Sequence, residues 1–239
     1  MTPRIASILL AVTLAGCASG SSPAPGPAAR ATGLASQDQR ITESSRRADH
    51  HTFEGVQERL RVLNTAGVPL AHYPLAKAQC WLDTARTQWH ENDRTGYVEE
   101  ALAEAIRLVE ALEAKPPQPT GPGTALIAGS TRLRDDLWSR LQSFKAQPAT
   151  LACTARTVAC AEVRLVRAGH ADQQTGWRAA STHVAMVEDA LRLAEQQAAR
   201  CSAAAGPAGA MAMPVTTPVV RPSGVPGAGP VSAPGATAR

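Results

Sequence analysis

Apolar residues recur every three or four positions through the middle of the chain, and this spacing restricts the fold more than any other feature of the sequence. The most regular stripe continues without a slip from 177 to 201: Trp177, Ala180, Val184, Val187, Leu191, Ala194, Ala198 and Cys201. Steps of three and four place side chains on one face of an α-helix, whereas a half-buried strand shows alternation. We therefore predict an all-α fold.

Turn residues divide this region into about six expected helices. Their approximate ranges are 38–66, 74–91, 98–112, 124–147, 150–168 and 177–201. Gly67 and Pro69 end the first, and a proline-rich linker at 115–123 separates the third from the fourth. The first stripe includes Ile41 and Ala48 but is regular only from Phe53 onward. The fifth helix is apolar on several faces, which predicts a central position.

The sequences before and after the proline-rich linker resemble each other. A shift of 80 residues superposes Cys80 on Cys160, His90 on His170, Thr95-Gly96 on Thr175-Gly176, and Tyr97 on Trp177. Each half, 38–114 and 124–201, is then expected to hold a long helix and a helical hairpin. The halves are expected to pack either as an antiparallel bundle or as a short hairpin array.

The first residues are typical of an exported protein. Arg4 precedes an apolar run at 5–14 that is too short to span a bilayer as a helix. The run ends in Leu14, Ala15, Gly16 and Cys17, which resembles the lipobox of bacterial lipoproteins. The resemblance implies removal of a signal peptide at 1–16 and acylation of the Cys17 thiol. It also implies attachment to a membrane through that lipid anchor, and Ala18, where retained lipoproteins often carry Asp, favours the outer membrane on its periplasmic face.

Two low-complexity segments flank the expected helical domain at 38–201. Residues 17–37 are mostly Ser, Gly, Pro and Ala, and residues 202–239 are rich in Ala, Gly and Pro with no acidic residue. Neither composition buries enough apolar surface to fold, so we predict a disordered N-terminal tether and a disordered C-terminal tail.

Several stretches of the helical region resemble a known family. The stretches are 63–67, 73–83 (Tyr-Pro-Leu-Ala-Lys-Ala-Gln-Cys-Trp-Leu-Asp), 91–96, 133–138 and 159–169. They are similar to the N-terminal periplasmic helical region of proteobacterial OmpA-family outer-membrane proteins. In that family the region precedes an OmpA-like peptidoglycan-binding domain. This chain shows no Asn-x-x-Leu-Ser-x-x-Arg-Ala pattern of that domain, so peptidoglycan binding is not supported and no family site residue carries over.

Cysteine usage fits an oxidising compartment. With Cys17 acylated, Cys80, Cys153, Cys160 and Cys201 allow three connectivities. A Cys153–Cys160 bridge is disfavoured because seven residues of helix span about 10.5 Å, beyond the reach of a disulfide. Candidate bridges are Cys153 with Cys201 across an antiparallel hairpin, and Cys80 with Cys160 at repeat-equivalent positions. Buried free thiols are the alternative.

Charge and motif content argue against several functions. The net charge of +4 comes from arginines interspersed with acidic residues, which indicates no nucleic-acid patch. Adjacent His50 and His51 are poorly placed as joint metal ligands, and His90 and His170 suit helix C-termini. No sequence motif indicates a metal, a cofactor or a nucleophile.

The remaining candidates for chemistry have simpler explanations. The pairs Glu99-Glu100 and Asp135-Asp136 are expected as solvated helix carboxylates. The four tryptophans could line a ligand groove, but each falls on or beside an apolar stripe, so core packing is expected: Trp81, Trp89, Trp138 and Trp177.

A non-enzymatic function is therefore expected. The first expectation is a structural or scaffold lipoprotein of the outer membrane, with possible partners among periplasmic envelope proteins. The alternative is a protein-interaction module of the helical-hairpin type, which an uncovered concave apolar surface would favour. An enzyme acting on wall polymers would need two carboxylates converging in a cleft.

Overall fold

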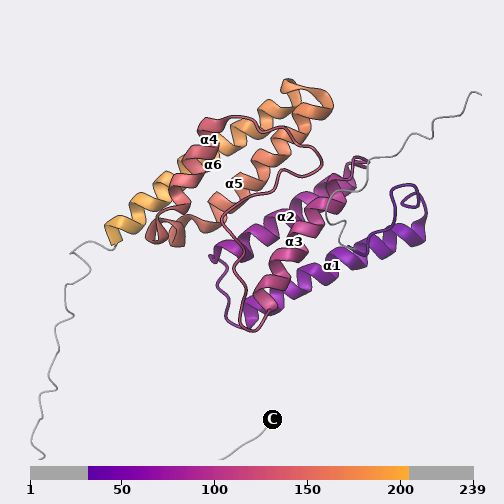
Figure 1. The fold of residues 1–239 in the computed structure, drawn as a ribbon, viewed down its shortest axis with the longest axis horizontal. Coiled ribbons are helices and arrows are strands. Elements are labelled where there is room, and N and C mark those ends of the chain that lie inside the picture. Colours follow the sequence, from indigo (N-terminus) through magenta and orange to yellow (C-terminus); the bar gives the residue numbers. More distant parts are fainter. Residues whose placement is uncertain (1–31, 205–239) are drawn as a thin grey trace, which may run out of the picture. The chain divides into compact units, whose positions relative to one another are not determined.

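A computed structural model describes residues 32–204, which form six helices (Figure 1). The helices are α1 (Glu43–Thr65), α2 (Tyr73–His90), α3 (Tyr97–Glu113), α4 (Asp135–Lys145), α5 (Pro148–Thr175) and α6 (Trp177–Ala204). All regular secondary structure in this part of the chain is helical, so the all-α prediction is confirmed. The predicted signal peptide, the lipobox Leu14-Ala15-Gly16-Cys17 and nearly all of the predicted tail lie outside the described residues.

The hairpin of α2 and α3 follows its predicted stripes. The stripe of α2 is buried along its whole length: Leu75, Ala78, Leu82, Ala85 and Trp89. Four of the five stripe positions of α3 are buried as well: Val98, Leu102, Ala105 and Val109. Each buried Val or Leu side chain contributes about 1.5–3 kcal/mol. The regular apolar spacing therefore accounts for this hairpin.

The beginning of α1 differs from the prediction. Phe53, Val56, Leu60 and Leu63 are buried as expected. Ile41 is 75% exposed and precedes the helix, which begins only at Glu43, where the Thr42 hydroxyl accepts from the backbone N–H of Ser45.

Asp49, rather than Ala48, is buried in the first turns of α1, with an exposed fraction of 0%. Its carboxylate accepts from the backbone N–H of Ala35 at 2.7 Å and from Nε1 of Trp89 at 2.8 Å, and it pairs with Nε of Arg40 at 3.2 Å. These contacts hold residues 33–35 against α1. The folded part therefore begins before residue 38, and the end of the predicted tether belongs to the domain.

The predicted fourth helix is wrong over its first half, because residues 124–134 are not helical and α4 begins at Asp135. Ala128, Gly129 and Arg134 have positive φ angles of 48°, 66° and 54°, which a right-handed helix does not allow. Ile127 is buried, and the backbone N–H of Ala128 donates to Glu100 at 2.7 Å. The segment is therefore an ordered loop packed on the helices.

Helix α5 is central, as predicted, but longer, because it continues to Thr175. Buried residues lie on several of its faces. Gly169 permits a close approach of the loop, since a Cβ there would lie 1.9 Å from the carbonyl oxygen of Thr131. Helix α6 buries the middle of its predicted stripe, from Ala180 to Ala194, whereas Trp177 at its first position is 54% exposed.

The hairpin turns of the two halves place a glycine at the equivalent position but differ in geometry. Gly96 has a ψ angle of −4° and ends the turn at 91–96, whereas Gly176 has a ψ angle of 178° and alone separates α5 from α6. Helices α3 and α6 begin 80 residues apart, at Tyr97 and Trp177, each directly after a glycine with positive φ: 86° at Gly96 and 84° at Gly176. Helices α2 and α5 contact each other and run in the same direction. The beginning of α2 lies near Arg156, its middle bonds Cys160, and its end pairs with Arg167. Parallel α2 and α5 fit a hairpin array better than an up-and-down bundle, in which neighbours alternate in direction.

Candidate functional site

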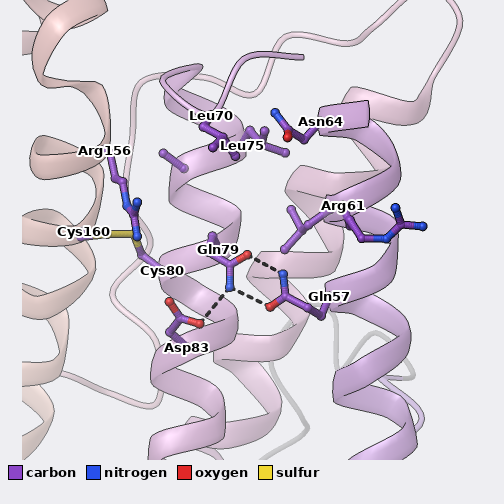
Figure 2. Close-up of a pocket in the computed structure, with 12 residues that line it drawn as sticks. Gln57, Arg61, Asn64, Leu70, Leu75, Gln79, Cys80, Asp83, Arg156 and Cys160 are labelled. Carbon is purple, nitrogen blue, oxygen red and sulfur yellow. Dashed lines mark hydrogen bonds between the residues drawn. A yellow bond between two sulfur atoms is a disulfide. The ribbon is translucent and has the colours of Figure 1, made fainter. Parts of the chain in front are cut away.

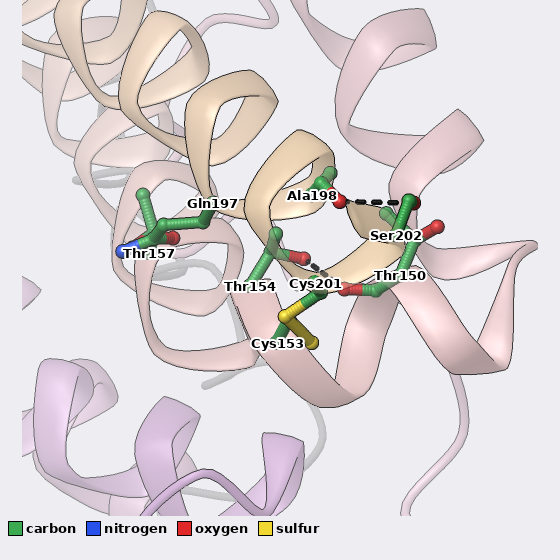
Figure 3. The surroundings of a disulfide bond; sticks show 8 residues. All are labelled: Thr150, Cys153, Thr154, Thr157, Gln197, Ala198, Cys201 and Ser202. Atoms are coloured by element: carbon green, nitrogen blue, oxygen red, sulfur yellow. Dashed lines mark hydrogen bonds between the residues drawn. A yellow bond between two sulfur atoms is a disulfide. The ribbon is translucent and has the colours of Figure 1, made fainter. Parts of the chain in front are cut away.

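Two disulfides fix the helices that frame the candidate site. Cys80 of α2 bonds Cys160 of α5 with a Cα–Cα distance of 5.2 Å, and Cys153 of α5 bonds Cys201 of α6 at 6.5 Å. These are the two pairings favoured from the sequence. One turn from the second bridge, the Thr157 hydroxyl donates to Gln197 at 2.9 Å (Figure 3). Both hairpins are thus covalently linked at α2–α5, and the end of α6 is held against the start of α5.

A cavity of about 340 Å³ opens beside the first disulfide, between α1, α2 and α5 (Figure 2). Gln57 of α1 and Gln79 of α2 exchange two amide hydrogen bonds of 2.8 and 2.9 Å, and Gln79 also donates to Asp83. Leu60 and Leu75 are buried in the wall, whereas Leu70 is 64% exposed at its edge. The cavity therefore combines an apolar wall with amide groups.

A second cavity of about 150 Å³ lies further along the same helices. It shares Cys80, Asp83 and Cys160 with the first cavity, and it extends along α2 to Glu91 and across to His183 of α6. The two cavities adjoin at these three shared residues along α2 and α5, and we call the pair of cavities the α2–α5 groove. Its ends are bounded by α1 and by α6.

Charge is distributed unevenly across the groove. The wall formed by α5 and α6 carries Arg156, Arg164, Arg167 and His183, whereas the α2 wall carries only the carboxylates of Asp83 and Glu91. Burial lowers the pKa of His183, and the nearby positive charges of Arg167 and Arg164 lower it further. The α5–α6 wall is therefore a region of positive potential.

A buried charged cluster lies elsewhere on α5. Glu162 is fully buried, and its carboxylate pairs with Lys77 at 3.3 Å and with Lys145, and accepts from the hydroxyl of Tyr73. Lys77 also donates to the carbonyl oxygen of Gly123 and the hydroxyl of Thr124, both at 2.7 Å. Burial lowers the pKa of Lys77 and raises the pKa of Tyr73. The cluster ties the proline-rich linker to α2 and α5.

A cavity of about 520 Å³ borders this cluster, with Glu162, Lys145, Trp138 and Arg132 in its lining. Glu162 is the sole carboxylate in that lining, so the cavity lacks the converging carboxylate pair of a glycosidase. Two features of the sequence could have indicated this cluster. The chain has only three lysines, and Glu162 interrupts the apolar stretch of the central helix.

His170 forms a second buried polar cluster, near the end of α5, which is Thr175. Its Nε2 lies 2.7 Å from Asp93 and 3.2 Å from the hydroxyl of Thr95, and its ring stacks on Tyr97 with centroids 4.3 Å apart. A catalytic relay needs one partner on each ring nitrogen. Here all the polar contacts, including one with the side-chain amide of Gln174 at 3.0 Å, are to Nε2, and Nδ1 has no hydrogen-bond partner among the described residues. The cluster joins the α2–α3 turn to α5.

The other residues singled out from the sequence do not form a site. Glu99 pairs with Arg40 at 2.5 Å, Asp135 pairs with Arg132 at 2.7 Å, and Asp136 pairs with Arg134 at 2.8 Å. Three of the four tryptophans pack in the core as predicted: Trp81, Trp89 and Trp138. His50 lies against the rings of Trp89 and His90.

Residues 32–204 hold neither a metal-binding cluster nor a helix that could span a membrane. Within that range, no group of three or more His, Cys, Asp or Glu side chains is placed to hold a metal ion. Over the same residues, every helix is too short or too polar to cross a bilayer.

Comparison of the chain with protein-family models, with curated proteins and with solved structures found no match. The resemblance to the OmpA family therefore depends only on the stretches quoted from the sequence.

Proposed function

We propose that this chain is a non-enzymatic lipoprotein of the bacterial outer membrane that binds a protein segment in its α2–α5 groove. The sequence alone favours a structural or scaffold function, with a protein-interaction module as the alternative. The groove is the observation that favours the interaction module, because it is open between parallel helices and has an apolar wall. Helical-hairpin arrays use such surfaces to bind extended segments of other proteins.

The buried polar groups support a role without catalysis. Glu162, Lys77 and Lys145 pair with one another and with linker carbonyl groups, and His170 bridges a turn to a helix. These groups already serve the fold. The groove lining offers a disulfide, amides, arginines, His183 and the carboxylates of Asp83 and Glu91, a mixture that suits polar contacts with a peptide segment.

The proposed location depends on the lipobox, which lies outside the described residues. Acyl groups on Cys17 would hold the helical domain at the membrane, since more than one chain gives stable anchoring. Replacing Cys17 by Ser should move the protein from the membrane fraction to the soluble fraction. Mass spectrometry of the native chain should find an acylated residue 17 at the amino terminus, and an intact, unmodified terminus would refute this part of the proposal.

Binding in the groove is tested with variants that each carry a photo-crosslinking amino acid at one exposed leucine position. The crosslinking is carried out in cells. Leu70 lies at the edge of the groove and is 64% exposed, and Leu193 on α6 is outside the groove lining and 46% exposed. We expect a discrete adduct from position 70 and none from position 193. The adduct should disappear when Gln57 is replaced by a bulkier Trp, which fills the groove.

Two results would contradict the proposal. One is equal labelling from positions 70 and 193, which indicates unspecific collision. The other is an adduct at position 70 that persists unchanged with Gln57→Trp. A scaffold without a groove partner would give no adduct at either position while retaining its membrane location.

A further inference from the structure

The α6 end of the groove holds an arginine whose charge is poorly balanced. The side chain of Arg167 is only 14% exposed. Its Nη2 donates to Glu91 at 3.3 Å, and Glu91 itself is 54% exposed. Nε and Nη1 of Arg167 are buried and have no hydrogen-bond partner among the described residues. Its guanidinium also lies over the ring of Tyr97, 5.9 Å from the centroid. A largely buried cation with this contact and one long, half-exposed ion pair would still be stabilised by further negative charge nearby.

Two more cationic or ionisable groups line the same cavity. Arg164 is exposed, and its one hydrogen bond in the described structure is from Nη1 to the sulfur of Met186 at 2.9 Å. His183 on α6 has a buried Nδ1 without a partner among residues 32–204. Glu91 and Asp83 are the only acidic residues of this lining. Three nitrogen-bearing side chains therefore line one cavity, and two of them, Arg167 and His183, have buried nitrogen atoms without a hydrogen-bond partner among the described residues.

We infer that this end of the groove is a carboxylate-binding site, in which Arg164, Arg167 and His183 recognise a Glu or Asp side chain of an acidic peptide segment. The inference rests on the proposed function and names the chemistry of the partner. A cavity of about 150 Å³ accommodates one side chain rather than a larger group. The leucine-lined part of the groove would take the neighbouring residues of the same segment.

Desolvation favours a carboxylate over a phosphate. The formal charges of Arg164, Arg167, Glu91 and Asp83 in this lining cancel, so the cost of removing the ligand from water decides, and that cost is larger for a dianion than for a monoanion. The chain's own C-terminal segment is a poor occupant, because residues 202–239 contain arginine but no acidic side chain. A separate acidic segment is thus the best complement to these arginines.

The test uses the full lipidated chain in detergent, with ¹³C-labelled histidine and NMR detection of the His183 ring. The probes are N-acetylglutamate amide, its neutral isostere N-acetylglutamine amide, and inorganic phosphate, all at one ionic strength. The glutamate probe should shift the His183 signals saturably and raise the pKa of His183, because it offsets the arginine charges. The glutamine probe should do neither.

Two arginine variants give a matched comparison. Arg164→Gln should weaken the glutamate response by up to about fivefold, the equivalent of one exposed ion pair. Arg192→Gln removes a positive charge from an exposed i,i+3 pair on α6, outside the groove, and should leave the response unchanged. Both positions are on the surface, so folding should be preserved in each variant.

Several outcomes would overturn the inference: no saturable shift, an equal response to the glutamine probe, tighter binding of phosphate than of glutamate, or equal weakening by both variants. The result also separates this inference from the proposed function. An adduct at position 70 without a glutamate response refutes only the carboxylate site. A glutamate response without that adduct refutes groove binding of a protein partner.

Discussion

Helix α5 carries a largely buried charged residue on each of two faces, and these two residues differ in how completely their charges are paired. Glu162 and Arg167 are five residues apart, which places them about 140° apart around the helix. Glu162 is paired with two lysines and a tyrosine hydroxyl, whereas Arg167 has one pair with a half-exposed carboxylate. The pairing of Glu162 is typical of a charged group that stabilises the fold. The weaker pairing of Arg167 is typical of a charged group that binds a ligand.

The largest effect on stability is expected from replacing Glu162, on the face of α5 where the buried charges are paired. Glu162→Gln keeps the shape of the side chain but removes the carboxylate that pairs with buried Lys77, and breaking such a pair typically costs about 3–5 kcal/mol. Chemical denaturation should show a loss of that size. Glu188→Gln, which breaks an exposed pair with Arg134, is the control and should cost less than about 1 kcal/mol. Similar losses in the two variants would remove the distinction between the faces.

The two disulfides should give the next largest effects. Replacing both cysteines of either pair by serine should lower the free energy of unfolding by about 2–4 kcal/mol, because each bridge closes a long loop. Only Cys80–Cys160 lines the groove, so only its loss should also weaken the response to the glutamate probe. Weakening by the Cys153–Cys201 variant of similar size would show that the groove depends on global stability instead.

The sequence predicts most of the helices because their apolar spacing is regular. It fails where backbone conformation or polar contacts decide the structure. The spacing of Leu126 and Leu133 continued the pattern of the fourth helix, yet the positive φ angles at Ala128 and Gly129 form a loop. Asp49 displaces Ala48 from the core because a tryptophan and a backbone N–H from outside α1 meet its carboxylate.

The candidate site was less predictable than the fold. Repeat equivalence and hairpin geometry indicated the two cysteine pairs. The groove could not be derived, because it depends on α2 and α5 lying parallel, and stripes on separate helices do not fix their relative direction. Arg164, Arg167 and His183 come together only through that packing, and no spacing in the sequence distinguishes them from other solvated basic residues.

A small effect on stability is expected from replacing Arg167, whose charge is only weakly paired. Arg167→Met keeps most of the apolar stem and removes the cation, so the loss of its pair with Glu91 should be offset by relief of its desolvation. We expect the free energy of unfolding to change by less than about 1 kcal/mol. A loss comparable to that of Glu162→Gln would show that Arg167 is a structural group, and the comparison of the two faces would then fail.

The smallest effect is a pH dependence of stability that originates at His183. Burial, Arg167 and Arg164 lower the pKa of His183 in the folded chain below its value in the unfolded chain. The unfolded state therefore binds a proton more readily, so stability is highest above about pH 6.5 and falls as the pH is lowered through and below that value. Thermal unfolding between pH 7.5 and 5 should show this decline, and His183→Gln should flatten it.

The glutamate probe sharpens this last expectation. A bound carboxylate offsets the arginine charges and raises the pKa of His183 toward its unfolded value, so saturation with the probe should reduce the decline in stability below pH 6.5. The glutamine probe is the control and should leave the decline as it was. An unchanged slope with the glutamate probe would mean that desolvation alone sets the pKa of His183, and that the positive charges of α5 act on no ligand at this position.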